Sequence, residues 1–273
     1  MIPQGVYTDL SNDEYHEDTN SISRSAIMAF RDSPYKYWAR YLNPNRPPKK
    51  MTDAMEFGKA FHEFVLEPEE FKKHFVTKPT KVLLKNVGRE KYEEYKKICA
   101  DLEETNMIVL DDEDYLKLVD MRDALMNHPR ARELIEGAMY ERSYFWEDEH
   151  SGLMVKARPD ILHDNLIVDL KTCANASPRA FQYAMIDGGY HIQGAMVREG
   201  VNIMESRDIP TIVNIPIEKE YPHSIGVYVI DEFALDEGRM QYKQALLDIK
   251  NARADNEYPD YPVQSISLPK WAL

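Results

Sequence analysis

The sequence predicts an α/β fold in which helices flank a mixed β-sheet. Helical patterns fill much of residues 21–138, apolar runs of strand length follow within residues 139–230, and a long helical pattern begins residues 231–273. Helices before and after a group of strands are typical of a sheet that is covered on its faces. We expect a single domain over residues 1–273, in which residues 1–20 form an ordered arm rather than a helix.

The part of the chain that follows this arm is expected to be mainly helical. Ser23 is a suitable N-cap for a first helix, which should end before Pro34 because the residue preceding a proline avoids the helical conformation. A second helix should span residues 51–66. The other expectations here are a basic loop at 43–50, a charged stretch that is helical from about residue 88, a connector at 105–111, and helices over 112–126 and 130–138.

Three strands should form an antiparallel meander near the middle of the chain. Residues 140–146 alternate and are rich in aromatic side chains, and the apolar runs 153–157 and 166–170 are separated by His163-Asp164-Asn165. Asp and Asn tolerate turn conformations, so this break indicates a hairpin turn. Beyond it we expect helices over 177–186 and 190–198 broken by Gly188-Gly189, strands over 210–217 and 224–230, and a helix over 231–253 capped by Asp231.

The composition indicates a soluble protein with a substantial core. The 273 residues are 43% hydrophobic and 30% charged, which suits one elaborated domain. No apolar run is long enough for a membrane span, and the N-terminus does not show the pattern of a signal peptide. The two cysteines, Cys99 and Cys173, are too few for a disulfide framework. We therefore expect a protein of the reducing cytoplasm.

The charge balance limits how the protein could bind nucleic acid. The formal net charge is −13, whereas general nucleic-acid binders carry a basic footprint that displaces counterions from phosphates. Part of the negative charge could belong to metal ligands, and an enzyme that acts on nucleic acid can confine its positive charge to one channel. If this protein acts on DNA, we expect a locally basic groove on an acidic body.

Three charged residues at two neighbouring strands carry the strongest chemical signal. Asp169 and Lys171 lie two positions apart on one strand, so their side chains share a face, and Asp160 ends the strand before it. Carboxylates are hard oxygen ligands that suit Mg²⁺ or Mn²⁺, and a lysine beside them can orient a water or stabilise charge on a phosphate. The pattern predicts metal-assisted phosphodiester hydrolysis. The alternative is an exposed hairpin with a salt bridge.

Residues elsewhere in the chain could complete such a site. His62 shares a helix face with Gly58 and is either a buried core histidine or a third metal ligand; together with the downstream motif we favour the ligand. Ser23 and Arg24 begin a helix, and a helix N-terminus with an adjacent guanidinium suits a phosphate. A solvated first-turn arginine is the equal alternative for Arg24.

These features resemble a known family, the RecE-type exonucleases (the nuclease domain of exonuclease VIII) of the PD-(D/E)xK nuclease superfamily. The order and rough spacing of the motifs match over nearly the whole chain, and jointly they are specific. The motifs are Ser21-Ile-Ser-Arg-Ser25, Gly58-Lys-Ala-Phe-His62 with Leu66-Glu-Pro68, Arg158-Pro-Asp160, Asp169-Leu-Lys-Thr172, Tyr190-His-Ile-Gln193 and Leu268-Pro-Lys-Trp-Ala272.

The resemblance implies a restriction-endonuclease-like core with a metal site. His62, Asp160 and Asp169 would be metal ligands, and the Leu170 carbonyl would also face the ion. Asp160, Asp169 and Lys171 would form the catalytic set, with Lys171 as the catalytic lysine. The implied cofactor is Mg²⁺, with Mn²⁺ as a substitute.

The resemblance also suggests residues that support the site or contact DNA. Tyr190 and Gln193 share a helix face and are placed in this group together with Ser23 and Arg24. Glu141 lies on the strand before the hairpin, where some members of the superfamily carry an acidic residue.

The function implied by the resemblance is that of a Mg²⁺-dependent exodeoxyribonuclease. It would degrade one strand of linear double-stranded DNA from 5′ to 3′ and leave 3′ single-stranded tails for recombination. A ring-shaped homo-oligomer, a single-strand annealing protein of the RecT type as partner, and the cytoplasm of a bacterial or phage-infected cell are also implied. The familiar bacterial example has a long N-terminal extension that this chain lacks, so we expect a stand-alone nuclease of phage or prophage origin.

Two other functions stay open. One is a RecB-like or repair nuclease of the same superfamily with another polarity, which the lack of helicase motifs and of a cysteine cluster disfavours. The other is a non-catalytic DNA-binding protein that retains the fold. Such proteins lose ligands or the lysine, whereas His62, Asp160, Asp169 and Lys171 are all present here.

Overall fold

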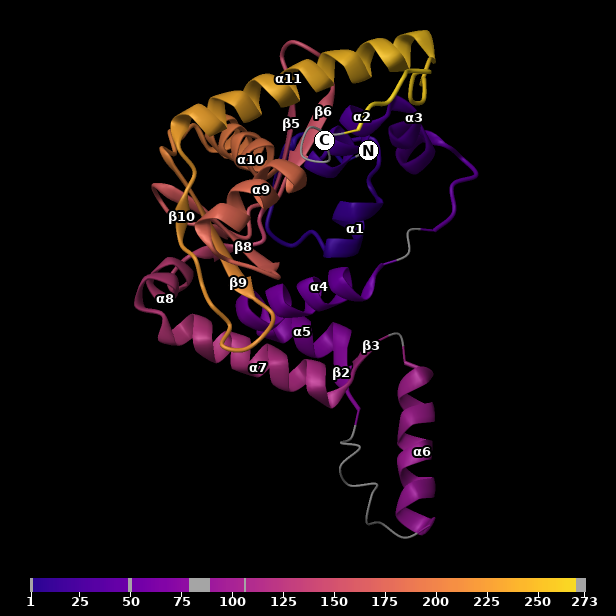
Figure 1. The fold of residues 1–273 in the computed structure, drawn as a ribbon, viewed down its shortest axis with the longest axis vertical. Helices are drawn as coiled ribbons and strands as arrows, with labels where there is room; N and C mark the ends of the chain where they lie inside the picture. Colours follow the sequence, from indigo (N-terminus) through magenta and orange to yellow (C-terminus); the bar gives the residue numbers. More distant parts are fainter. Residues whose placement is uncertain (1, 49–50, 79–88, 106, 269–273) are drawn as a thin grey trace.

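The computed structural model describes residues 2–48, 51–78, 89–105 and 107–268, and these form a mixed α/β domain (Figure 1). A five-stranded sheet has the order β10 (Tyr228–Val229), β9 (Thr211–Glu218), β8 (Leu166–Cys173), β7 (Ile161–Leu162) and β4 (Met139–Tyr140). A three-stranded sheet has the order β1 (Gly5–Tyr7), β5 (Ser143–Glu147) and β6 (Met154–Ala157). The short strands β2 (Phe75–Thr77) and β3 (Ile108–Leu110) pair in parallel.

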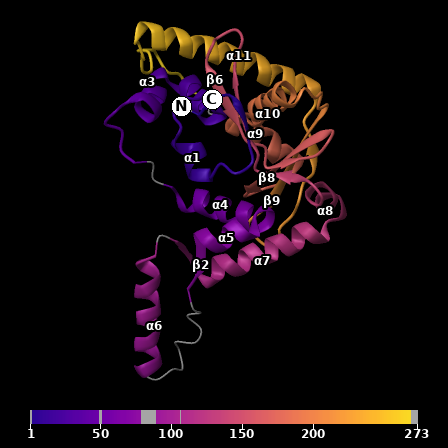
Figure 2. The same cartoon turned by 180° about the vertical axis from the view of Figure 1, so that it is seen from behind.

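Helices precede, interrupt and follow these strands, as the sequence predicts. In chain order they are α1 (Asn12–Glu17), α2 (Arg24–Asp32), α3 (Pro34–Tyr37) with a π-helix (Trp38–Leu42), α4 (Asp53–Leu66), α5 (Pro68–His74), α6 (Arg89–Glu103), α7 (Asp112–Asn127), α8 (Pro129–Ile135), α9 (Pro178–Gly188), α10 (Tyr190–Glu205) and α11 (Glu232–Asp255). Figure 2 shows α6 standing away from the other elements, at the end of the molecule opposite α11. Among the described helices, none combines the length and apolar character that crossing a membrane requires.

The expected mixed sheet is confirmed. Strands β8 and β9 are parallel, and the chain passes between them through α9 and α10, as parallel neighbours require. The other pairs of the five-stranded sheet are antiparallel. Side chains of β8 alternate between two cores: Ile167 belongs to the one that contains α10 and α11, while Val168 and Leu170 belong to the one that contains α4, α7 and α8. The face of β8 that carries Asp169 therefore lies under α10.

The predicted antiparallel meander is wrong. Glu141 has a φ of 49°, in the left-handed region, and it divides the expected strand 140–146 into β4 and β5. The expected strand 153–157 corresponds to β6, and a break at Arg158 to Asp160 separates it from a further strand, β7. Because β5 pairs with β6 while β4 pairs with β7, the chain crosses twice between the two sheets. The first break falls at Glu141, a residue type that does not signal a positive φ, while Pro159 within the second break is a sign of it.

Other local expectations have mixed outcomes. Ser23 caps α2 and Asp231 caps α11, as predicted. The arm at residues 1–20 is not free of helix, because Ser11 and Glu14 form a capping box that begins α1. The connector at 105–111 contains β3. Lys49 and Lys50 of the basic loop, residue 88 at the start of the charged helical stretch, and residues 269–272 of the final motif lie outside the described residues.

Candidate active site

Asp160 stands at the corner where the chain leaves β6 for β7. Its carboxylate oxygen Oδ2 accepts a hydrogen bond of 2.7 Å from the backbone N–H of Leu170 on β8. Ile161 pairs with Val168, so the antiparallel register brings Asp160 beside Asp169. Asp160 and Asp169 are only 8% and 7% exposed. The hairpin thus places two buried carboxylates next to each other, as the sequence predicts.

Asp169 and Lys171 project together from the face of β8 under α10, while the side chain of Leu170 is buried on the other face. Lys171 Nζ lies 2.5 Å from Asp169 Oδ2. Gln193, on the first turn of α10, donates from Nε2 to Asp169 Oδ1 over 2.7 Å. The two oxygens of Asp169 are therefore held by two side chains, Lys171 of β8 and Gln193 of α10. The structure brings together Asp160, Asp169 and Lys171, as the sequence predicts.

His62 and Glu141 complete a cluster around Asp160. His62 Nδ1, on α4, lies 3.6 Å from Asp160 Oδ2. Glu141 arrives through the left-handed kink that divides the predicted strand, and its backbone N–H donates to the Asp160 carbonyl over 3.3 Å. His62, Glu141 and Asp160 each offer a ligand atom, and these atoms lie within 4.8 Å of one another. Glu141, whose role the sequence does not define, is thus one of the three residues of this cluster.

The electrostatics of the cluster are those of crowded negative charge. Burial, and then the charge of Asp160, raise the pKa of Glu141 well above its usual value. Burial and the charge of Asp169 likewise raise the pKa of Asp160, against the opposing effect of His62 and Lys171. Burial lowers the pKa of Lys171, but the charges of Asp169 and Asp160 outweigh this effect and the net shift is upward. Lys171 is therefore an ammonium at neutral pH.

The residues present fit a hard divalent cation. The convergent donors are one imidazole nitrogen and two carboxylates, a set that suits Mg²⁺ or Mn²⁺. A positive charge placed among them would relieve the repulsion that raises the carboxyl pKa values. Asp169, which the resemblance implies as a ligand, is not one of these three convergent donors and lies next to Asp160 across the hairpin.

The other predicted site residues lie at one side of this cluster. Arg24 Nη1 donates to the Gly188 carbonyl over 2.7 Å, and its guanidinium lies 6.0 Å from the centre of the Tyr190 ring. Lys171 Nζ lies 5.1 Å from the same ring centre. Ser23 has a different task, because its hydroxyl accepts the Ala26 backbone N–H as the N-cap of α2.

One supporting arginine is missed by the sequence reasoning. Arg158 donates from Nε to Ser143 Oγ over 2.8 Å and from Nη2 to the Leu10 carbonyl over 2.9 Å. Its guanidinium lies 4.3 Å from the ring centre of Tyr15 on α1. Arg158 thereby ties the N-terminal arm to the corner that carries Asp160. Arg158 belongs to the motif Arg158-Pro-Asp160, in which the sequence indicates a function for Asp160 alone.

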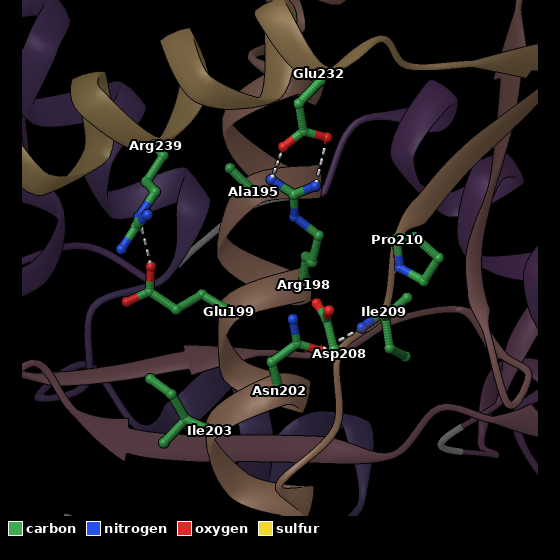
Figure 3. A pocket seen from close by; sticks show the side chains of 10 residues that line it. All are labelled: Ala195, Arg198, Glu199, Asn202, Ile203, Asp208, Ile209, Pro210, Glu232 and Arg239. Atoms are coloured by element: carbon green, nitrogen blue, oxygen red, sulfur yellow. Dashed lines mark hydrogen bonds and ion pairs between the residues drawn. The ribbon is translucent and has the colours of Figure 1, made fainter.

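A separate cavity of about 560 Å³ lies along a different part of α10 (Figure 3). Four of its five charged side chains form ion pairs: Arg198 binds both carboxylate oxygens of Glu232 at 2.8 Å, and Arg239 lies 3.3 Å from Glu199. None of the clustered carboxylates at Asp160 lines it. The chemistry therefore centres on the hairpin rather than on this cavity.

A mixed sheet whose hairpin presents Asp160, Asp169 and Lys171 beneath a covering helix defines a domain of the PD-(D/E)xK type. The chain belongs to the family described as PDDEXK-like domain of unknown function (DUF3799), which matches residues 23–266. The superfamily and the restriction-endonuclease-like fold expected from the sequence are thus confirmed.

Two solved structures are similar to this chain, and the first of them shares its fold. A protein from Eubacterium rectale, described as "Putative exonuclease", is similar with a TM-score of 0.62 and 14% identity, covering 94% of this chain and 97% of that chain. An alkaline exonuclease from Laribacter hongkongensis matches with a TM-score of 0.28 and 17% identity, covering 72% of this chain and 95% of that chain. Among curated proteins there is no match.

Proposed function

We propose that this protein is a divalent-metal-dependent nuclease that hydrolyses phosphodiester bonds of DNA. The observation that supports this most strongly is the convergence of His62, Glu141 and Asp160 beside the Asp169–Lys171 pair. When bound, a divalent cation supplies Lewis-acid chemistry at the phosphoryl group and lowers the pKa of a bound water. His62, Glu141 and Asp160 would hold it, with Asp169 adjoining.

The remaining residues have roles that follow from their contacts. The Lys171 ammonium would orient the attacking water or stabilise the charge that develops on the phosphate. Gln193 would keep Asp169 in one orientation through its hydrogen bond to Oδ1. Because both aspartates are buried, electrostatic interactions within the site are stronger than they would be in water.

Arg24 is proposed to bind the backbone or the terminal phosphate of the DNA. Its hydrogen bond to the Gly188 carbonyl turns the guanidinium toward Tyr190 and Lys171. Guanidinium groups bind phosphate oxygens through paired donors. Arg24 would then supply positive charge beside the carboxylate cluster, which supports a locally basic contact surface on a protein with a net charge of −13.

The finer proposal is a Mg²⁺-dependent 5′ to 3′ exonuclease on linear duplex DNA that leaves 3′ single-stranded tails for recombination. Its support is the RecE-type motif set and the description of the Eubacterium rectale protein as an exonuclease. A ring-shaped homo-oligomer, an annealing partner of the RecT type, and a cytoplasmic location in a bacterial or phage-infected cell belong to the same proposal.

The test is cleavage of 5′-phosphorylated linear duplex, circular duplex and single-stranded DNA with Mg²⁺ or Mn²⁺. We expect linear duplex to be degraded from its 5′ ends, with a 3′ end label retained on long fragments, and circular duplex to stay intact. Cleavage of the circle, or degradation from 3′ ends, would favour a RecB-like or repair nuclease. DNA binding without cleavage under all these conditions would favour the non-catalytic alternative.

A further inference from the structure

Three aromatic rings from three elements stack in line beside Lys171. Tyr228 of β10 lies 5.3 Å from Phe181 of α9 with an interplanar angle of 30°, and Phe181 lies 5.8 Å from Tyr190 of α10 with an angle of 27°. Spacings and angles of this kind are those of offset-stacked rings. The last ring, Tyr190, contacts the Lys171 ammonium at 5.1 Å. The stack therefore runs from the edge strand of the sheet to the lysine.

The far end of the stack is fixed to the protein. The Tyr228 hydroxyl donates to the Ala176 carbonyl over 2.6 Å, and Phe181 is buried. Ring–ring contacts of this kind restrict the rotamers of all three side chains. Tyr190 thus has a rigid neighbour on the side that Phe181 occupies.

The backbone holds Tyr190 as well. A Cβ atom at residue 188 would lie only 2.5 Å from Cε1 of the Tyr190 ring, so only glycine allows this close approach. The next residue, Gly189, has a φ of 63° and turns the chain from α9 into α10. The contacts that the structure describes for the Tyr190 side chain all involve its ring rather than its hydroxyl.

A lysine in this position needs support besides its ion pair. Lys171 has a flexible stem, and Asp169 attracts its ammonium toward the carboxylates. An aromatic face attracts a cation without neutralising it. The Tyr190 ring can therefore hold the ammonium in place while its charge stays directed toward the phosphate.

We propose that Tyr190 is a positioning residue that acts on Lys171 through its ring, and that Phe181 and Tyr228 brace this ring. The inference rests on the proposed nuclease function and deepens it. Of the two roles expected for Tyr190, which were to support the site or to contact DNA, it assigns the first. Phe181 becomes a determinant of the cleavage rate although it is buried behind Tyr190.

The test compares Tyr190→Leu, Tyr190→Phe and Phe181→Leu with the wild type under single-turnover conditions, with DNA affinity measured separately in Ca²⁺. Tyr190→Leu should cleave about tenfold slower with unchanged DNA affinity, the scale of one partly desolvated cation–π contact. Tyr190→Phe should recover the rate to within about threefold of wild type, because the ring remains. Phe181→Leu should slow cleavage by about threefold to tenfold, again without a change in affinity.

Two controls make the comparison specific. Tyr183→Leu removes an exposed aromatic side chain of α9, which is 61% exposed, and should leave cleavage unchanged. In a Lys171→Met background, Tyr190→Leu should cause no further loss, because residues that act through one another are not additive. Thermal unfolding checks that each variant is folded. If Tyr190→Leu does not fold, the cleavage rate of Phe181→Leu is the test of the inference.

Several results would overturn the inference. Weaker DNA binding with an unchanged cleavage rate in Tyr190→Leu would show that the ring contacts DNA instead. Equal losses in Tyr190→Phe and Tyr190→Leu would assign the effect to the hydroxyl. If the rate losses of Tyr190→Leu and Lys171→Met were fully additive, Tyr190 would not act through Lys171. A wild-type protein that cleaves no DNA would refute the proposed function and this inference together, whereas an active wild type with an unaffected Tyr190→Leu variant refutes the inference alone.

Discussion

Replacing Lys171 by alanine distinguishes a catalytic lysine from a structural one. Lys171 Nζ lies 2.5 Å from Asp169 Oδ2, and 16% and 9% of the two side chains are exposed. A lysine that only served a weak ion pair would contribute about 1 kcal/mol or less, which corresponds to about fivefold in rate. Loss of one electrostatic catalytic group costs about a hundredfold to a thousandfold. We expect Lys171→Ala to cleave at least about a hundredfold slower than wild type.

The variant should remain folded and should still bind its ligands. Removing the ammonium leaves Asp169 Oδ2 without its ion-pair partner, while Gln193 still donates to Oδ1. Removing one partner of a buried ion pair costs about 3–5 kcal/mol of the free energy of unfolding, which is at the lower end of the total stability of a typical domain, about 5–15 kcal/mol. A protonated lysine cannot ligate a cation, so binding of Mg²⁺ should persist.

The assay is single-turnover cleavage of end-labelled duplex at saturating Mg²⁺, with binding to duplex ends measured in Ca²⁺. Lys59→Ala is the matched control, because Lys59 Nζ pairs with Glu63 Oε1 at 3.8 Å on α4 and has a similarly low exposure. We expect the control to stay within a few-fold of wild type. A Lys171→Ala rate within a few-fold of wild type would refute the catalytic assignment of the whole hairpin.

Four further predictions follow from the site and the fold. Excess EDTA should abolish cleavage, Mg²⁺ or Mn²⁺ should restore it, and Ca²⁺ should support DNA binding alone, as activity assays with each metal can show. Arg24→Ala should reduce the preference for 5′-phosphate over 5′-hydroxyl ends, measured as a ratio of cleavage rates; an unchanged ratio would contradict the phosphate-binding role. Burial lowers the pKa of Lys156 from 10.5 to about 8. The unfolded chain therefore holds more protons between these values, and urea unfolding should show stability rising with pH across this window by at most about 3 kcal/mol relative to Lys156→Met. Light scattering at micromolar concentration should give the mass of a closed oligomer, and a strictly monomeric mass would count against the ring.

The signals that the sequence revealed were local ones. Asp169 and Lys171 lie on one strand, so the period of a strand was enough to place them on one face. Tyr190 and Gln193 lie one turn apart, so the period of a helix was enough for them. The caps Ser23 and Asp231 were equally visible, because capping depends on a few neighbouring residues.

What the sequence did not reveal depends on the backbone and on contacts between distant segments. The role of Glu141 follows from one residue with a positive φ, and glutamate is not a residue type that signals this conformation. The stack of Phe181 on Tyr228 joins α9 to β10, and the contact of Arg158 with Tyr15 joins the corner after β6 to α1. Such contacts join segments that are far apart in the sequence, so they cannot be predicted from the residue pattern within one segment.

The corner at Asp160 also bears on the order in which the protein assembles. The hydrogen bond from Leu170 to Asp160 spans 10 positions along the chain, and short loops lose little entropy when they close. Asp160 and Asp169 therefore meet as soon as the β7–β8 hairpin forms. His62 and Gln193 belong to α4 and α10 and reach these carboxylates only when the helices dock.

During folding, the hairpin therefore holds two like charges together, with Lys171 of β8 as the cation that it supplies itself. This repulsion disfavours an isolated hairpin. Docking of α4 and α10 brings His62 to Asp160 and Gln193 to Asp169, but it also buries the pair, and the raised pKa of Asp160 shows that repulsion persists in the folded protein. The acidic pair thus links completion of the site to completion of the core, so a partly assembled chain should not present the finished cluster to DNA.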